Sequence, residues 1–338
     1  MRLQILVSQY NETEEVVAPL LKSLAIQQGI DLSEIGVIIV NDGSEVKLSE
    51  EFLHSFPFPV EYIRAEHKGV SAARNRALDE ATAEYVMFCD ADDMFISACG
   101  LYILFREMRG QGFNALSSVF VEETRDPKTG ERIYINHETD STFVHGKVYR
   151  RSFLKHNNIR WDDSLTIHED SYFNCLAQKV AREIKYCKEP FYLWKWRDDS
   201  VCRRDPKYIL KTYVNMLESS TALVREFLAR GMQREAEYYA ANMIYDGYFT
   251  MNKDEWCNEA NADYRKSTED RFCIYYSEFR ELFESVSPET RNGIIVGMKN
   301  RFFAEGVLLE SVTFDEWIKH ISALSADSNV HNFGCKSL

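Results

Sequence analysis

The chain has 338 residues, of which 45% are hydrophobic and 13% aromatic. This length accommodates a medium-sized catalytic domain with a second domain, and this apolar content excludes a disordered chain. The formal net charge of −13 at pH 7 excludes a general affinity for nucleic acid or an anionic membrane, because both attract positively charged proteins. No apolar run reaches the roughly 20 residues of a membrane-spanning helix, and the N-terminal run is too short for a signal peptide. We therefore expect no integral membrane segment.

Eight cysteines are spread along the chain, and none forms a CxxC pair. Stable disulfides are rare in the cytosol, and a zinc site needs more closely spaced ligands. The cysteine pattern therefore predicts reduced, mostly buried thiols and a cytoplasmic location.

Strand and helix patterns alternate over the first 205 residues. Apolar runs predict strands at 4–8, 36–40, 60–64 and 85–89. Apolar residues with helical spacing predict helices at 14–28 and 71–83. This β-α-β-α-β order implies an α/β fold, with a Rossmann-like, mostly parallel sheet and helices on both of its faces.

The pattern changes at about residue 206, where strand signals nearly vanish. The segments beyond it with helical spacing are 207–230, 233–251, 268–285, 288–303 and 314–323. We expect a first domain over 1–205, an all-helical C-terminal domain over 206–325 and a flexible tail over 326–338. The segment 238–251 is so rich in tyrosine and phenylalanine that it must bury one face, either within the chain or in a homo-oligomer.

Polar residues follow two of the predicted strands, at the point where each strand ends. They are Asn41-Asp42-Gly43-Ser44 and Asp90-Ala91-Asp92-Asp93. Ligands of parallel sheets bind beyond the carboxyl ends of the strands, although both segments also fit ordinary turns. The carboxylates of the second segment repel one another, and Mg²⁺ or Mn²⁺ would offset that repulsion and neutralise a leaving diphosphate. Asp93 is first a candidate helix cap.

These segments belong to a longer series of motifs that occur in a fixed order. The motifs are Tyr10-Asn11-Glu12, Val40-Asn41-Asp42-Gly43-Ser44, His67-Lys68-Gly69-Val70-Ser71-Ala72-Ala73-Arg74-Asn75, Phe88-Cys89-Asp90-Ala91-Asp92-Asp93, His145-Gly146-Lys147-Val148-Tyr149-Arg150-Arg151 and His168-Glu169-Asp170. Together they resemble glycosyltransferase family 2, whose members have the GT-A fold. The resemblance covers about residues 1–205.

The resemblance implies a metal-dependent, inverting glycosyltransferase. Such an enzyme moves a sugar from a nucleotide-sugar, most often a UDP-sugar, to a hydroxyl of a glycan, polymer or other acceptor. The residues implied to bind the nucleotide are Tyr10, Asn11, Glu12, Asp42, Arg74 and Asp90. Of these, Asp42 would pair with the base, and Arg74 would touch the ribose or the diphosphate. Asp92 would bind Mn²⁺ or Mg²⁺, with Asp90 as a second candidate ligand.

Asp170 resembles the catalytic base of the family. A hydroxyl is a poor nucleophile until a base takes its proton. A base on one face of the sugar and a leaving diphosphate on the other give a single displacement with inversion. Glu169 would raise the pKa of Asp170 by like-charge repulsion. Taken alone, the two acidic residues fit an ordinary helix N-terminus equally well.

The sequence departs from the family after the base. Many relatives carry a histidine there that completes the metal shell, whereas the segment 192–200 has none. The third protein ligand of the metal is therefore undetermined, and Arg197 could bind the diphosphate directly. The candidates for the acceptor or diphosphate side are Glu169, Lys147, Trp196 and Arg197.

The segment 147–160 holds five basic residues and no acidic one. In a chain of net charge −13, this reversal has two interpretations. It indicates either a site for a polyanionic acceptor, such as a teichoic-acid-like polymer or nucleic acid, or a basic surface that is solvated or paired with acidic neighbours.

Two other functions fit parts of the pattern. A non-catalytic GT-A module that binds sugar or protein would not need the carboxylates, which are intact here. A nucleotidyltransferase would need a basic, glycine-rich loop after the first strand, which Tyr10-Asn11-Glu12 does not supply.

Overall fold

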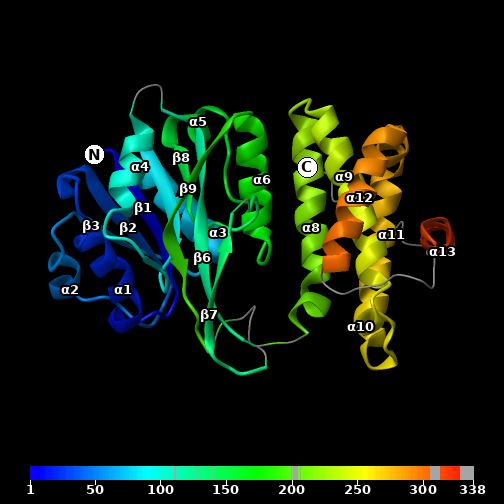
Figure 1. Ribbon diagram of the computed structural model, residues 1–338, viewed down its shortest axis with the longest axis horizontal. Helices are drawn as coiled ribbons and strands as arrows, with labels where there is room; N and C mark the ends of the chain where they lie inside the picture. Colours follow the sequence, from blue (N-terminus) through cyan, green and yellow to red (C-terminus); the bar gives the residue numbers. More distant parts are fainter. Residues whose placement is uncertain are drawn as a thin grey trace. The chain divides into compact units, whose positions relative to one another are not determined.

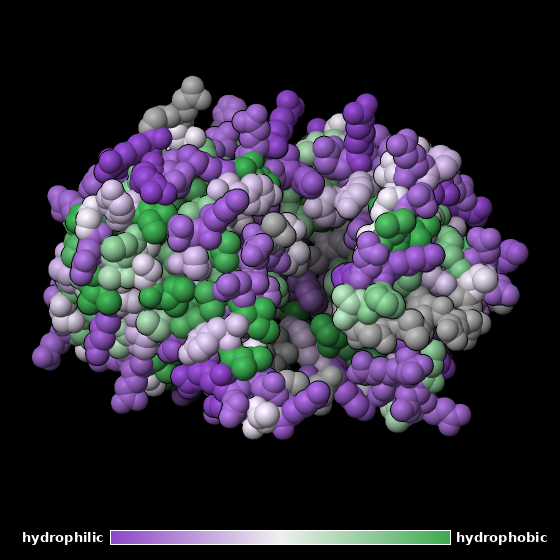
Figure 2. Space-filling view, in the orientation of Figure 1, coloured by the Kyte–Doolittle hydropathy of each residue, from purple (hydrophilic) through white to green (hydrophobic). Residues whose placement is uncertain are grey.

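The computed structural model describes residues 1–109, 112–126, 128–138, 140–198, 200, 205, 207–304 and 313–327 (Figure 1). They form two compact units, Met1–Ser200 and Val201–Leu338. The tail predicted over 326–338 lies outside the described residues except for its first two. On the face seen in Figure 2, hydrophilic side chains are interspersed with hydrophobic ones over each unit. This is an ordinary surface for a charged protein.

Four parallel strands form the first half of the sheet in the N-terminal unit. Their order across the sheet is β3 (Val60–Ala65), β2 (Ile35–Asp42), β1 (Leu3–Gln9) and β4 (Tyr85–Asp90). Ser8 pairs with Val40 on one side and with Asp90 on the other, so the carboxyl ends of three strands are level. The polar residues that follow these strands are therefore brought to one edge of the sheet, as expected for this topology.

The second half of the sheet is mixed. It contains β5 (Met94–Phe95), β6 (Ala115–Arg125), β7 (Arg132–His137), β8 (Lys147–Arg150) and β9 (Ile184–Trp194). β8 runs antiparallel to both β4 and β6, whereas β9 runs parallel to β6 and antiparallel to β5. β7 joins β6 through a short connection and must therefore pair with it antiparallel. The predicted parallel pairing is thus found in the first four strands and between β6 and β9, whereas the other strand pairs are antiparallel.

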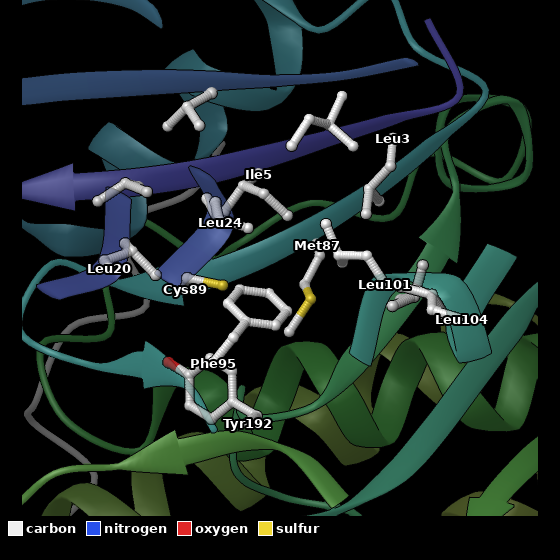
Figure 3. Close-up of a cluster of buried hydrophobic side chains, with 14 of the residues drawn as sticks. Leu3, Ile5, Leu20, Leu24, Met87, Cys89, Phe95, Leu101, Leu104 and Tyr192 are labelled. Carbon is white, nitrogen blue, oxygen red and sulfur yellow. The ribbon is translucent and has the colours of Figure 1, made fainter. Parts of the chain in front are cut away.

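Helices cover both faces of the sheet, as predicted. Alternate residues of β1 pack against α1 (Glu14–Ala25) and α4 (Gly100–Met108), and Figure 3 shows this cluster with Leu3, Ile5, Leu20 and Leu101 among its members. On the opposite face lie α3 (Val70–Glu80) and α6 (Glu169–Ala181), where the Phe88 ring contacts the Phe173 ring. The shorter helices of this unit are η1 (Leu32–Glu34), α2 (Glu50–His54) and α5 (Arg151–His156).

The described residues of the C-terminal unit form helices and no strand. The helices are α8 (Tyr208–Ala229), α9 (Gln233–Met251), α10 (Asp254–Cys257), η2 (Glu259–Asn261), α11 (Ala262–Ser285), α12 (Pro288–Ala304) and α13 (Phe314–Asp327). α9 packs against α8, α11 and α12. Its Tyr245 ring contacts the Phe283 ring of α11, so much of the aromatic face is buried within the unit. Among the described residues, none of the helices has the length and apolar character needed to cross a membrane.

Candidate active site

A cavity of about 280 Å³ opens at the carboxyl ends of β1, β2 and β4. We call it the strand-end cavity. The candidate site residues that line it are Tyr10, Glu12, Asp42, Asp90 and Asp92. These residues come from three separate strand ends, and the register of the parallel strands is what brings them together.

The Asp42 carboxylate fixes the loop that leads into α3. It accepts hydrogen bonds from the backbone N–H groups of Lys68 at 2.8 Å and Gly69 at 3.0 Å, and His67 Nδ1 lies 2.9 Å from Oδ2. Gly69 has a φ of 92°, which favours glycine. Gly43 has a φ of 70°, and a Cβ there would lie 2.6 Å from the backbone nitrogen of His67. Asp42 thus lines the cavity, and its carboxylate oxygens already accept hydrogen bonds from the loop that precedes α3.

An aromatic pair stands at the cavity mouth. Tyr10 is 50% exposed, and its ring stacks on the His67 ring with centroids 4.4 Å apart. Asn11 adopts a left-handed φ of 69°, and its N–H donates to Ser44 Oγ at 2.9 Å. The Tyr10 N–H donates to Glu12 Oε2 at 2.6 Å. The turn therefore holds a flat aromatic surface in place, the kind of surface on which a nucleobase stacks.

Glu12, Asp90 and Asp92 form an acidic wall of the cavity, and Arg197 contacts two of them. Its Nη1 is 3.1 Å from Asp92 Oδ2 and 4.0 Å from Glu12 Oε1. Burial raises the pKa of Asp92, the nearby Asp90 raises it further, and Arg197 acts in the opposite direction. Burial also raises the pKa of Glu12, and Asp92 adds to that shift. This wall carries more negative than positive charge, so it would favour a further cation.

Arg74 bridges two of the candidate carboxylates. It is 5% exposed, and it donates to Glu169 Oε1 and to Asp90 Oδ1, both at 2.9 Å. Its guanidinium also lies 4.4 Å from the Trp161 ring centroid. The contact of Arg74 with ribose or diphosphate stays a prediction, and in the structure its guanidinium contacts two protein carboxylates. Arg74 ties the end of β4 to the start of α6.

Asp170 is the second residue of α6 and lies beside this bridge. Burial, with a smaller contribution from the neighbouring Glu169, raises its pKa to about 7, although Arg74 opposes the shift. His168, just before the helix, has a left-handed φ of 61°, a conformation that is costly for a residue with a Cβ and often occurs at functional sites. A carboxyl with a pKa of about 7 can accept a proton at neutral pH.

Asp93 is not a helix cap, because α4 begins only at Gly100. Its buried carboxylate accepts hydrogen bonds from the Tyr192 hydroxyl at 2.6 Å and from the Lys195 N–H at 2.9 Å. Asp93 therefore fastens the acidic loop to the end of β9. Burial raises the pKa of Asp93 well above its usual range, and Asp90 adds to the shift.

His145 lies next to Asp93 and was not among the candidates from sequence. It is 3% exposed, and its Nδ1 has no hydrogen-bond partner in the described part of the chain, although Asp93 Oδ2 is 3.6 Å away. Asp90, Asp93 and His145 offer ligand atoms that all lie within 4.8 Å of one another. Carboxylate oxygens with one imidazole nitrogen suit a divalent cation such as Mn²⁺. The acidic loop and His145 therefore fit a metal.

Two further candidates lie apart from the strand-end cavity. Lys147 is 1% exposed, and its ammonium donates to Asp140 Oδ1 at 3.1 Å, so its charge is used inside the protein. Burial lowers the pKa of Lys147, whereas Asp140 raises it. The Trp196 indole N–H donates to Asp198 Oδ1 at 2.8 Å. Neither residue is among those that line the cavity.

Comparison with known proteins shows which family and fold the chain resembles. Residues 4–168, just under half of the chain, match a family described as glycosyl transferase family 2. Over this part the chain resembles that family. It is 27% identical to the uncharacterized glycosyltransferase EpsJ of Bacillus subtilis, over 59% of this chain and 62% of EpsJ. It is 25% identical to the poly(ribitol-phosphate) beta-N-acetylglucosaminyltransferase TarS of Staphylococcus aureus, over 64% of this chain and 38% of TarS.

The same fold occurs in a solved structure. Residues 1–349 of S. aureus TarS, in complex with UDP-GlcNAc, superpose with a TM-score of 0.57 at 18% identity, over 92% of this chain and 93% of that one. At this identity the likeness shows the fold alone, which is the GT-A fold followed by helices. The matches with EpsJ and full-length TarS each span less than two thirds of those proteins.

The raised pKa of Asp170 predicts a pH-dependent stability. Between the pKa of an unfolded aspartate, near 4, and about 7, the folded state binds the Asp170 proton more tightly than the unfolded state does. The stability that this proton provides is present below pH 4 and is lost as the pH rises through 7. Relative to wild type, Asp170→Asn should therefore gain at least about 1 kcal/mol between pH 5 and pH 8. Urea denaturation at both pH values measures this difference.

The exposed Asp263→Asn provides the control and should show no such change with pH. A stability difference between wild type and Asp170→Asn that stays constant from pH 5 to pH 8 would contradict the raised pKa.

Proposed function

We propose that this protein is a metal-dependent, inverting glycosyltransferase that moves a sugar from a UDP-sugar to an acceptor hydroxyl. The observation that carries the proposal is the arrangement around Arg74, which holds Glu169 against Asp90. A candidate base at the start of α6 thereby lies next to a cavity with an aromatic wall and an acidic wall.

The donor side supports a nucleoside diphosphate. The stacked Tyr10 and His67 rings offer a platform for the base, and Asp42 lies beside them in the same cavity. TarS, a structural relative, has been solved with UDP-GlcNAc, which favours UDP as the nucleotide. The sugar itself is not specified by these contacts.

Asp92 is the proposed metal ligand, with Asp90 as a second and Asp93 and His145 behind them. When bound, Mn²⁺ or Mg²⁺ would neutralise the charge that develops on the leaving diphosphate. Arg197 already lies on Asp92, and it would turn to the diphosphate when the donor arrives. The loss of its partner carboxylate would then be offset by a doubly charged leaving group.

Asp170 carries the proton chemistry. In the proposed step, the acceptor oxygen forms a bond to the anomeric carbon while its proton passes to an Asp170 oxygen. The bond from that carbon to the diphosphate oxygen breaks on the opposite face, and the electron pair leaves with UDP. One displacement of this kind inverts the anomeric configuration. Glu169 and Arg74 orient the base from either side.

The acceptor is a glycan, a polymer or another hydroxyl-bearing molecule. TarS acts on poly(ribitol-phosphate), by its name, which supports an anionic polymer. The helical unit would serve assembly or acceptor placement, because its described residues contain no group of His, Cys, Asp or Glu side chains close enough to bind a metal. A homo-oligomer, a nucleic acid acceptor and a cytoplasmic location stay predictions from the sequence.

A non-catalytic module remains the main alternative, followed by a nucleotidyltransferase. The Asp170 carboxyl, whose pKa is raised by burial, favours an enzyme, because a binding module gains nothing from the cost of burying it. A nucleotidyltransferase would have a basic, glycine-rich phosphate-binding loop after β1. The turn at this position contains Tyr10 and Glu12 instead.

UDP should stabilise the protein against heat, and more so with Mn²⁺ or Mg²⁺ present. A ligand that binds only the folded state raises the melting temperature, by roughly 5 °C at a concentration about 100 times Kd. Asp92→Ala should remove the metal-dependent part of the shift and keep the fold. Glu66→Gln, which removes an exposed carboxylate from the neighbouring loop, should keep the full shift. If UDP with either metal gave no shift in wild type, the donor assignment would be wrong.

Arg197→Gln should affect the metal and the nucleotide in opposite directions. Without Arg197, Asp92 is free for Mn²⁺, so Mn²⁺ binding in the absence of UDP should tighten about fivefold, the worth of a partly exposed ion pair. UDP binding should weaken about tenfold because a charge-assisted contact to the diphosphate is lost, whereas UMP binding should change less. Free Mn²⁺ measured by EPR and calorimetric titration of UDP report the two effects.

Arg280→Gln is the matched control, because Arg280 is an exposed arginine of α11 that pairs with Glu284. An unchanged Mn²⁺ affinity in Arg197→Gln would show that the arginine and the metal do not compete for Asp92.

Asp170→Asn should lower turnover by about 10²–10⁴-fold, the usual contribution of a general base. UDP binding should scarcely change, because the base faces the acceptor. Wild-type turnover should rise with pH through about 7, as Asp170 loses its proton, and this step should be absent from the residual activity of the variant. Near-normal turnover in Asp170→Asn would leave these acidic residues with only a structural role at the helix N-terminus.

A further inference from the structure

The basic segment 147–160 divides into two groups in the structure. Lys147 is buried against Asp140, and Arg150 donates to Glu84 and to the Tyr85 hydroxyl, so both are engaged within the protein. The other three basic residues line a second cavity, of about 330 Å³. We call it the basic cavity, and it is defined by Arg151, Lys155 and Arg160.

The basic cavity carries uncompensated positive charge. The Arg160 guanidinium is bidentate on Asp79, at 2.7 and 2.9 Å, which balances one charge of each sign. Arg151 donates from Nε to the Ala83 carbonyl at 2.9 Å. The remaining guanidinium nitrogens of Arg151 and the Lys155 ammonium have no hydrogen-bond partner among the residues that the structure describes. Arg151 and Lys155 therefore leave a surplus of two positive charges.

The basic cavity has a buried apolar floor. Leu154 and Ile159 line the same cavity and are 0% and 1% exposed, so its floor is part of the hydrophobic interior. The Ile159 N–H donates to the Leu154 carbonyl at 2.9 Å, which holds the chain after α5 against the helix. An anion that enters would meet Arg151 and Arg160 already held by their bonds to the Ala83 carbonyl and to Asp79, which lowers the entropy cost of binding.

The same helix lines the strand-end cavity and the basic cavity. Val70, at the start of α3, lines the strand-end cavity, and Asp79, near its end, lines the basic cavity. Nine residues of α-helix separate them, which corresponds to about 14 Å along the helix axis. A polymer of a few units could therefore occupy the basic cavity while another of its units is near the reacting groups.

We propose that the basic cavity binds a phosphate group of an anionic polymer and so holds the acceptor at a second point. The role as acceptor rests on the proposed glycosyltransferase function, whereas the binding of a phosphodiester does not. Arginine nitrogens match the geometry of a phosphate, and Lys155 adds a point charge beside them.

The observations favour a polymer over a membrane. The cations line a cavity with a buried apolar floor, whereas membrane surfaces are bound by protruding basic and apolar side chains. The net charge of −13 would also repel an anionic bilayer, which meets a large part of the protein surface at once. A single chain that enters a local positive cavity avoids most of that repulsion.

Binding of a short poly(glycerol phosphate) chain tests the proposal. Calorimetric titration of the full-length protein without metal or UDP should show binding that the double variant Arg151→Gln, Lys155→Gln weakens about tenfold or more, as expected when charge-assisted contacts are lost. Lys155→Glu, which changes an exposed side chain, should weaken it in the same direction and keep the fold. Arg76→Gln, an exposed arginine of α3 paired with Glu80, is the matched control and should bind as wild type does.

Separate arms distinguish the source of the phosphate and the site. Asp92→Ala should leave polymer binding unchanged, so loss of the proposed donor function would not be mistaken for loss of this site. Mixed phosphatidylglycerol and phosphatidylcholine vesicles should not bind. The proposal is overturned if the double variant binds the polymer like wild type, if only vesicles bind, or if free glycerol phosphate binds as tightly as the polymer.

Discussion

The buried guanidinium of Arg74 is the interaction on which the candidate site depends. Without it, Asp90, Glu169 and Asp170 would bring three negative charges into a partly desolvated space, and removing one partner of such a buried group is costly. By donating to carboxylates at 2.9 Å on both sides, it joins the end of a central strand to the start of α6. Its guanidinium already pairs with two carboxylates, so a bound diphosphate would need further positive charge. In the proposed function, Arg197 and a metal on the acidic loop would supply it.

The strand ends show the same dependence of chemistry on fold. The parallel register of β1, β2 and β4 is set by fully buried apolar runs, and it delivers Asp42 and Asp90 to one edge. Glycines at positive φ then allow the loops around them to turn closely, as at Gly43. The carboxylate of Asp42 closes the arrangement by accepting backbone N–H groups. A polar cavity is thus built from backbone geometry that hydrophobic packing dictates.

Sequence reasoning succeeded where one physical signal dominated. Continuous apolar runs located β1, β2 and β4 to within two residues at each end, because strands buried on both faces carry little else. β3 was located to within one residue, although it contains Glu61 and Arg64 and none of its residues is fully buried. It missed β6, whose buried positions include Ser117, Ser118 and Glu123 and so break the apolar pattern. The partners of Asp93 and the position of His145 were also missed. Tyr192 and Lys195 lie about a hundred residues away in sequence, and only the assembled sheet brings them to the acidic loop.

The bond between the Lys195 N–H and Asp93 has a mechanical consequence for Arg197. It fixes the backbone at residue 195, and Arg197 follows two residues later in the chain. Two residues of extended chain span about 7 Å. The Arg197 side chain can therefore exchange one neighbouring anion for another by moving only itself and the two residues before it, while β9 stays in the sheet. Exchange of this kind requires no rearrangement of a long lid.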